Sequence, residues 1–177
     1  RIVDQDMNDV VHDGKTTGEV VARAPWLTQG YLKNHEASEQ LWRGGYMHTG
    51  DIGHIDAQGY LQITDRIKDV IKTGGEWISS LELEDIISRH IAVSEVAVIG
   101  VKDAKWGERP LVLVVLKAEY VGKLDQDEIK SHVKDYCDRG IVSLFAIPEK
   151  VLFIDTLEKT SVGKLNKKAM RKKYQGD

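Results

Sequence analysis

Three consecutive stretches of sequence decide the fold: SLELEDIISR at residues 80–89, VSEVAVIGV at 93–101 and LVLVVL at 111–116. The first begins with Ser, has acids in its first turn and spaces Leu83, Ile86 and Ile87 at helical intervals, which predicts a capped helix. The other two are rich in β-branched residues, and the last is apolar throughout. Both are typical of strands that face a core, and we expect them to pair.

Outward from these stretches, the pattern adds two helices and a strand. Residues 125–136 have apolar side chains at helical spacing, residues 151–154 predict a short buried strand, and residues 165–174 predict a basic helix. A short apolar strand is also expected between the Gly pair at 74–75 and the first helix. The order β, α, β, β, α, β, α over roughly a hundred residues indicates an α+β domain, in which helices pack on a small β-sheet.

Residues 1–60 have a different pattern, with short apolar stretches separated by Gly, Pro and other turn-forming residues. This predicts a β-rich region. The sequence Asp-Ala-Gln-Gly at 56–59 separates two β-type runs and predicts a hairpin, while residues 34–41 predict a short helix. The change of pattern near residues 65–69 predicts a domain boundary there.

Composition is that of a soluble globular protein: 177 residues, 41% apolar and 30% charged, with a net charge of −3. No apolar run approaches the roughly 18 residues of a membrane span. The first residues have neither an initiator Met nor a signal-peptide pattern. We therefore expect a cytoplasmic chain that begins within a longer protein.

Cysteine and charge indicate neither a metal site nor a nucleic-acid partner. Cys137 is the single cysteine, and no His/Cys cluster has zinc spacing, so we expect a partly buried, inert thiol and no bound metal. Residues 1–64 carry nine acidic and five basic side chains, whereas residues 159–174 carry seven basic and no acidic ones. Nucleic-acid binding needs a wider basic surface. A solvated helix face is the simplest interpretation of this basic tail.

Two segments carry candidate chemistry near the predicted boundary. YMHTGDIG at 46–53 places a Gly before Asp51, so that backbone can approach a ligand while the carboxylate accepts two hydrogen bonds from a ribose. An ordinary turn would use the same residues. In TDRIKDVIKTGGEWIS at 64–79, the Gly pair can line a narrow passage with bare backbone, or simply form a tight turn.

A third segment, EKTSVGKLNK at 158–167, presents Lys164 on a loop of small residues just before the basic helix. A lysine on such a loop can approach a phosphate and stabilise charge that develops there. The simpler alternative is a solvated surface lysine.

Together the three segments resemble, in order and spacing, the adenylate-forming enzymes, which include acyl-CoA synthetases, luciferase and the adenylation domains of peptide synthetases. Gly-Glu-Val at 18–20 and Gly-Tyr at 30–31 resemble a further family segment. The sequence IKTGGEWISSLELE at 71–84 is most similar to bacterial medium- and long-chain fatty acyl-CoA synthetases. The resemblance covers nearly the whole chain.

The resemblance implies three parts: the β-rich end of a large N-terminal domain at 1–64, a hinge at 65–69 and a mobile C-terminal lid domain at 70–177. The implied roles are nucleotide binding by Asp51, Arg66 and Lys164, catalysis by Lys164, a hinge at Lys68, and a path for the pantetheine arm of CoA lined by Gly74, Gly75 and Trp77. One position departs from the family, because the residue before Lys159 is usually Pro and is Glu158 here. This weakens the expectation of a rigid loop.

The activity implied by the resemblance has two steps. A fatty acid attacks the α-phosphate of ATP to give acyl-AMP and pyrophosphate, and CoA then attacks the acyl carbon and expels AMP. The implied cofactors are ATP/AMP, CoA and Mg²⁺, with Mg²⁺ bound mainly by the N-terminal domain. One lid position cannot bring a lysine to the phosphate and also open a thiol channel, so the lid is expected to rotate between steps.

The family's phosphate loop and its adenine-binding aromatic segment do not occur in this sequence. We therefore expect a C-terminal fragment of a fatty acid–CoA ligase, inactive alone and dependent on its own N-terminal domain. Two alternatives stay open. One is the lid of an amino-acid adenylation domain, which would pass its product to a carrier protein. The other is a stand-alone lid that docks on a partner and regulates it.

Overall fold

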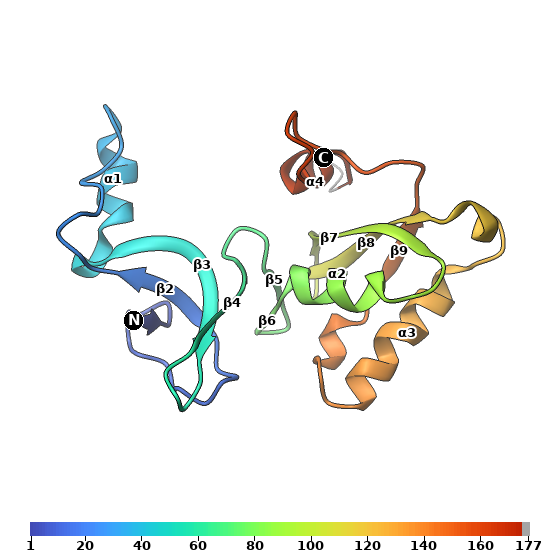
Figure 1. Ribbon diagram of the computed structural model, residues 1–177, viewed down its shortest axis with the longest axis horizontal. Coiled ribbons are helices and arrows are strands. Elements are labelled where there is room, and N and C mark those ends of the chain that lie inside the picture. Colours follow the sequence, from blue (N-terminus) through green and yellow to red (C-terminus); the bar gives the residue numbers. More distant parts are fainter. Residues whose placement is uncertain (175–177) are drawn as a thin grey trace. The chain divides into compact units, whose positions relative to one another are not determined.

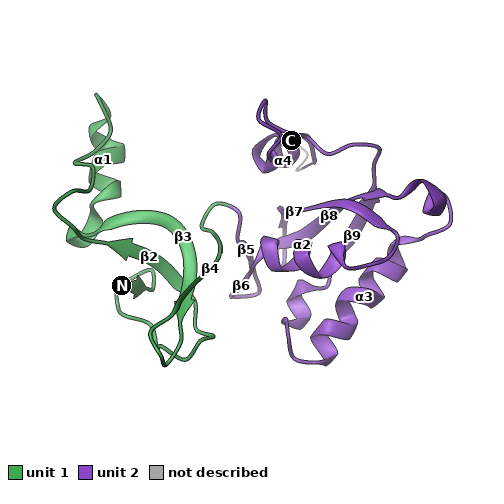
Figure 2. Cartoon of the chain, in the orientation of Figure 1, with its two compact units in different colours: residues 1–68 green, residues 69–177 purple. Residues whose placement is uncertain are grey.

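The computed structural model describes residues 1–174 (Figure 1). The chain divides into two compact units, Arg1–Lys68 and Asp69–Asp177 (Figure 2). The first unit is a four-stranded antiparallel sheet with the strand order β1-β2-β3-β4. Its elements are β1 (Ile2–Val3), β2 (Gly18–Ala22), the helix α1 (His35–Leu41), the short 3₁₀ helix η1 (Arg43–Gly45), β3 (Met47–Ile55) and β4 (Leu61–Arg66).

Local sequence explains two features of this unit, and both confirm predictions. The turn at 56–59 joins β3 to β4, and the Asp56 carboxylate accepts the backbone N–H groups of Gln58 and Tyr60, each at 2.9 Å. The helix predicted at 34–41 is α1, where the Asn34 side chain accepts the Ala37 N–H at 3.1 Å as an N-cap.

The second unit has a five-stranded sheet in the order β6-β5-β8-β7, with β9 pairing in parallel to β8. Helices pack against this sheet, which confirms the predicted α+β class (Figure 1). The elements are β5 (Ile71–Thr73), β6 (Glu76–Ile78), α2 (Ser80–Ser88), β7 (Val93–Asp103), β8 (Gly107–Leu116), η2 (Ala118–Tyr120), α3 (Gln126–Asp138), η3 (Leu144–Ala146), β9 (Lys150–Phe153) and α4 (Lys167–Tyr174).

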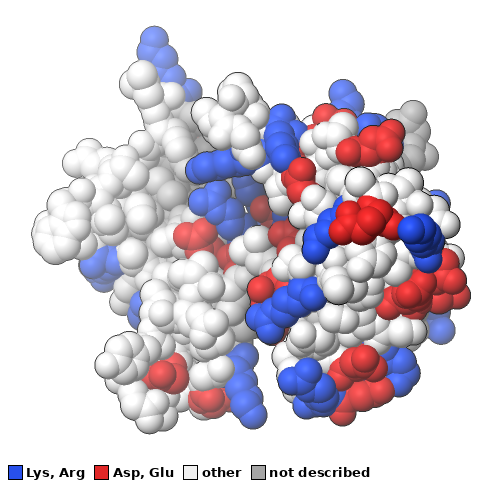
Figure 3. Space-filling model, turned by 45° about the vertical axis from the view of Figure 1, so that its right-hand side comes forward, with Lys and Arg blue, Asp and Glu red and all other residues white. Residues whose placement is uncertain are grey.

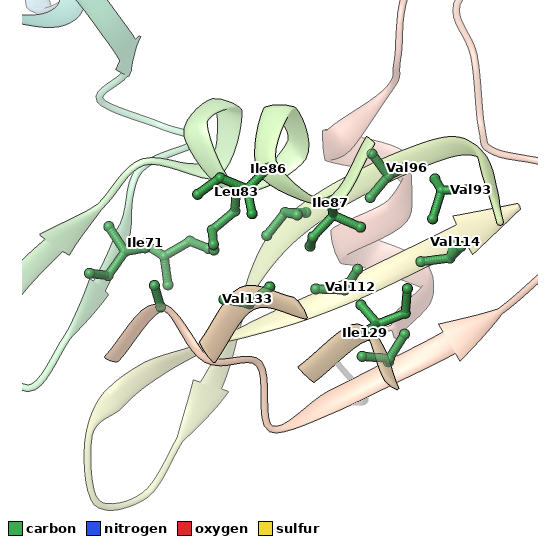
Figure 4. Close-up of a cluster of buried hydrophobic side chains, with 14 of the residues drawn as sticks. Ile71, Leu83, Ile86, Ile87, Val93, Val96, Val112, Val114, Ile129 and Val133 are labelled. Carbon is green, nitrogen blue, oxygen red and sulfur yellow. The ribbon is translucent and has the colours of Figure 1, made fainter. Parts of the chain in front are cut away.

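The core of the second unit follows the alternation of side chains along β7. Val96 and Val98 belong to a buried cluster that includes side chains of α2 and α3 (Figure 4). Ala97 and Ile99 belong to a second cluster, to which Met170 of α4 contributes. The sheet is therefore covered on one face by α2 and α3 and on the other by α4.

Several boundaries differ from the predicted ones. The cap of α2 is Ser79, not Ser80, since the Ser79 hydroxyl accepts the Glu82 N–H at 3.1 Å. The three-residue strand β5 was not predicted as a separate element, and the last helix begins at Lys167 rather than at residue 165. In α3, Cys137 is buried more completely than the partly buried Tyr136.

The expectation of a solvated face on the basic helix holds for Lys168, Lys172 and Lys173, which are exposed, but not for Lys167. On the face drawn in Figure 3, Lys and Arg side chains lie interspersed with Asp and Glu side chains. In α4, however, Lys167 is only 9% exposed, and its ammonium group pairs with the carboxylate of Glu84 in α2. Within residues 1–174, no helix is long and apolar enough to cross a bilayer.

Candidate functional site

The first candidate site lies where β3 and β4 pair. The strand register sets Asp51 opposite Arg66, and the Arg66 Nε lies 3.3 Å from the Asp51 Oδ1. The two side chains are 33% and 62% exposed, so both remain accessible to a ligand. Gly50, with φ of +72°, makes the bend before Asp51, a conformation that favours glycine. The result is an accessible carboxylate beside a guanidinium.

The bend at Gly50 is held from behind by Glu19 of β2. One Glu19 carboxylate oxygen accepts the Gly50 N–H at 3.2 Å, and the other lies 2.8 Å from the His48 Nδ1. The Thr49 hydroxyl donates to the Val20 carbonyl at 2.7 Å and accepts the Asp51 N–H at 3.1 Å. Sequence reasoning did not identify Glu19 and His48 as support for Asp51, although Gly-Glu at 18–19 was quoted as a family segment.

Lys68 is the last residue of the first unit and is exposed. The Ile67 N–H just before it donates to the Gly50 carbonyl at 2.8 Å, which ties the end of this unit to the bend beside Asp51. Asp69 then begins the second unit. The hinge role of Lys68 stays a prediction.

The Gly74-Gly75 pair forms the turn between β5 and β6. Both glycines have positive φ, +59° and +84°, which favours glycine at each position. A Cβ on Gly74 would lie 2.6 Å from the Phe145 ring, whereas a Cβ on Gly75 would meet nothing within 4 Å. Trp77 of β6 is partly buried, with the Lys72 Nζ 5.4 Å from its ring centroid. Gly74 thus packs on an aromatic ring, while Gly75 faces open space.

Next to this turn is a hollow of about 600 Å³ whose lining includes Trp106 and Phe145. Their rings meet edge to face with centroids 5.3 Å apart, and the Lys105 Nζ lies 4.5 Å from the Trp106 ring centroid. Arg109 donates to the Phe145 carbonyl at 3.1 Å and to the Ile147 carbonyl at 2.8 Å, which holds the segment that carries the ring. Sequence reasoning missed this hollow. Its one signal in the sequence was Trp106-Gly107, which lies between the strands predicted at 93–101 and 111–116.

Lys164 lies on a closed loop. The Thr160 N–H donates to the Lys164 carbonyl at 2.7 Å, and the Lys164 N–H donates to the Thr160 hydroxyl at 3.2 Å. An isolated bridge pairs Lys159 with Leu165 at the base of the loop, and Gly163 makes the bend with φ of +80°. The Lys164 side chain itself is exposed. Backbone hydrogen bonds therefore close the loop although Glu158 replaces the usual Pro.

The structure brings Asp51 and Arg66 together in the first unit, while the Gly74-Gly75 turn and the Lys164 loop belong to the second. The Asp51 carboxylate and the Arg66 guanidinium are groups that can form hydrogen bonds with hydroxyls and phosphates.

Burial raises the pKa of the Cys137 thiol, which disfavours its reactive thiolate form. Among residues 1–174, no group of three or more His, Cys, Asp and Glu side chains is arranged to hold a metal ion.

Comparison with known families and proteins gives a consistent result. Residues 82–164 match the AMP-binding enzyme C-terminal domain. A 3-methylmercaptopropionyl-CoA ligase from Ruegeria lacuscaerulensis is 40% identical over 174 residues, and a long-chain-fatty-acid–CoA ligase from Thermus thermophilus is 39% identical over 175 residues. Each alignment covers 98% of this chain but only 31% of the relative. The chain thus spans about a third of the length of these curated relatives.

A solved structure agrees in fold. The ATP-bound MatB from Rhodopseudomonas palustris superposes with a TM-score of 0.83 at 30% sequence identity. The match covers 99% of this chain and 33% of MatB. Both units of the chain therefore have counterparts in one solved protein.

Proposed function

We propose that this chain, whose residues 82–164 match the AMP-binding enzyme C-terminal domain, is the C-terminal part of an ATP-dependent fatty acyl-CoA synthetase of the cytoplasm. Residues 1–64 would form the last part of the large N-terminal domain. Residues 65–69 would be the hinge, and residues 70–177 would be the mobile lid. The observation that best supports nucleotide binding is the Asp51 carboxylate held beside the Arg66 guanidinium.

Asp51 and Arg66 would hold the nucleotide. A carboxylate can accept hydrogen bonds from both hydroxyls of a ribose, and charge-assisted hydrogen bonds of this kind are about twice as strong as neutral ones. Arg66 neutralises the carboxylate and offers further N–H donors to an adjacent phosphate. Because β-strand pairing and the Glu19 contact hold the bend at Gly50, Asp51 is set in place before a ligand arrives.

Lys164 would act in the first step. When the fatty acid carboxylate attacks the α-phosphate, negative charge builds up on the phosphate oxygens, and a positioned cation lowers the energy of that state. The Mg²⁺ that accompanies ATP would be bound mainly by the large N-terminal domain.

The Gly74-Gly75 turn and Trp77 would serve the second step. A thiol on a flexible arm can pass beside Gly75, where no side chain fills the space. The neighbouring hollow presents the Trp106 and Phe145 rings and the Lys105 cation. Its lining also includes Arg109 and the carboxylates of Asp103 and Glu149. Such a combination of aromatic faces and positive charge suits a nucleotide carrying phosphates, so the far end of CoA would lie there.

The test is an assay of the full-length protein with ATP, CoA and a series of fatty acids of increasing length. The proposal expects pyrophosphate release in the presence of a fatty acid and acyl-CoA when CoA is added. The 177-residue chain alone is expected to give no pyrophosphate exchange, since the ATP triphosphate and acyl sites would lie elsewhere. Adenylation of an amino acid without consumption of CoA would instead support an adenylation domain that serves a carrier protein.

A further inference from the structure

Helix α4 is attached to its unit by cations as well as by apolar packing. Of its residues, only Lys167 and Met170 are buried within the described part of the chain. Met170 joins the core cluster beneath the sheet. Lys167 and Arg171 are four residues apart, so they project from one side of the helix. Lys168 and Lys172 are exposed.

Lys167 reaches around the edge of the sheet to the helix on its other face. The Lys167 Nζ lies 2.7 Å from the Glu84 Oε1 and donates to the Ser80 hydroxyl at 2.8 Å. The same Glu84 oxygen accepts the Val98 N–H at 2.8 Å. Since β7 is the last strand in the sheet order, this contact covers a backbone donor of an edge strand. The pair thereby joins α4, α2 and β7.

One turn further along α4, Arg171 pairs with the residue that begins the second unit. The Arg171 Nη1 lies 2.9 Å from the Asp69 Oδ1, and the two side chains are 20% and 16% exposed. The pair joins residues 102 positions apart in the sequence. Asp69 directly follows Lys68, the proposed hinge. Helix α4 is therefore attached to the residue that directly follows Lys68.

The Lys164 loop continues directly into this helix. Only Leu165 and Asn166 separate Lys164 from the start of α4, and the Asn166 N–H donates to the Glu158 carbonyl at 2.8 Å. The loop is closed on itself by the bonds of Thr160 described above. Any shift or rotation of α4 therefore displaces the Lys164 ammonium group.

We propose that Lys167 and Arg171 are positioning residues for Lys164, and that the Arg171–Asp69 pair makes the loop follow the chain as it leaves the hinge. This inference rests on the proposed function. An ion pair withdrawn from water is satisfied in only one arrangement of its partners, so two such pairs specify one register of α4 on the unit. A reacting group displaced by about 1 Å can lose on the order of 100-fold in rate, even when the mutation lies far from it.

The test compares four methionine variants of the full-length enzyme: Arg171→Met and Lys167→Met, with the exposed neighbours Lys172→Met and Lys168→Met as matched controls. Adenylation is measured as pyrophosphate release, and thioester formation is measured from supplied acyl-AMP and CoA. We expect Arg171→Met and Lys167→Met to lower adenylation on the order of 100-fold. Thioester formation should change by less than about threefold, as should both steps in the controls.

The conservative variant Arg171→Lys should recover most of the adenylation rate, because it keeps a cation opposite Asp69. Amide exchange in residues 159–166 of the full-length protein should rise in Arg171→Met and not in Lys172→Met. The positioning role is overturned if Arg171→Met and Lys167→Met slow adenylation and thioester formation equally. It is also overturned if adenylation and the amide exchange of residues 159–166 are both unchanged.

Lys164→Ala, assayed in the same experiment, distinguishes a failure of this inference from a failure of the proposed role of Lys164. If it abolishes adenylation while Arg171→Met and Lys167→Met do not, this inference is wrong and the proposed function stands. If Lys164→Ala itself leaves adenylation intact, the role of Lys164 is wrong and the inference fails with it.

Discussion

Asp51 and Lys164, two of the residues proposed to contact the nucleotide, are held in opposite ways. Asp51 lies inside a strand, opposite Arg66 in a fixed register and behind a bend held by Glu19. Lys164 lies at the end of a small loop, and its position depends on the helix that follows. The first arrangement suits a group that holds one ligand throughout a reaction. The second suits a group that is brought to the ligand for one step and then withdrawn.

This difference predicts a division of labour between the two units. A strand-borne carboxylate should matter equally to adenylation and to thioester formation, since acyl-AMP carries the same ribose as ATP. A cation on a loop of the second unit, which is proposed to be mobile, should matter only where phosphate charge increases. The following variants of the full-length enzyme test this comparison, from the largest expected effect to the smallest.

Lys68→Pro should cause the largest change, because it restricts the backbone rotation that is proposed to let the second unit change position between the two steps. Proline fixes φ near −65° and restricts the preceding residue, so the chain between the two units loses its adjustable joint. One half-reaction is expected to fall to background while the other survives. Half-reaction rates, with circular dichroism as a check of folding, measure this. Equal loss of both steps would count against a hinge at Lys68.

Asp51→Ala should weaken both steps together. It removes two charge-assisted hydrogen bonds, each worth about 1.5–3 kcal/mol, so we expect a loss on the order of 10²–10⁴ in kcat/KM for ATP. Asp51→Asn, which keeps the shape and one acceptor, should lie between this variant and the wild type. A loss confined to one half-reaction would show that Asp51 is not a permanent support.

Gly75→Leu should affect only the second step. A Leu side chain would enter the space that is open beside Gly75, and we expect thioester formation to fall on the order of tenfold or more with adenylation preserved. Gly75→Ala is the matched control, because both variants have the same unfavourable φ of +84° and differ only in side-chain size. If the two variants behave alike, backbone strain and not a blocked passage explains the effect.

Trp106→Ala should have the smallest effect, confined to CoA. Loss of one aromatic stacking surface costs about 1–3 kcal/mol, so we expect the KM for CoA to rise about tenfold with the KM for ATP unchanged. Trp26→Ala, which removes an indole that is 83% exposed in the other unit, is the control. A rise in the KM for ATP as large as that for CoA would exclude the hollow as a CoA subsite.

Sequence predicted the elements whose signals are local. The helix at 80–89, the strands at 93–101 and 111–116, and the turn at 56–59 all depend on periodicity or on turn residues within a few positions. The cap of α2 was displaced by one residue because two serines adjoin, and only the backbone geometry shows which hydroxyl accepts a bond. Strand β5 was missed because three residues are too few for a period to emerge.

Long-range contacts were beyond local patterns. The Glu19 contacts with His48 and Gly50 join residues 29 and 31 positions apart, and they require the irregular register between β2 and β3. The burial of Lys167 was not predicted, for a similar reason. A run of basic residues in a helix indicates a solvated face, and its acidic partner Glu84 lies in another helix. Candidate residues could thus be named from motifs, but their supports could not.

The most direct test of the division of labour is to measure both half-reactions of Lys164→Ala beside those of Asp51→Ala. Losing one preorganised cation should lower adenylation on the order of 10²–10³ while leaving CoA attack on supplied acyl-AMP nearly intact. Asp51→Ala should impair both steps. If Lys164→Ala instead loses the two steps equally, the loop lysine is a permanent support like the strand carboxylate, and the account of a group delivered for one step is contradicted.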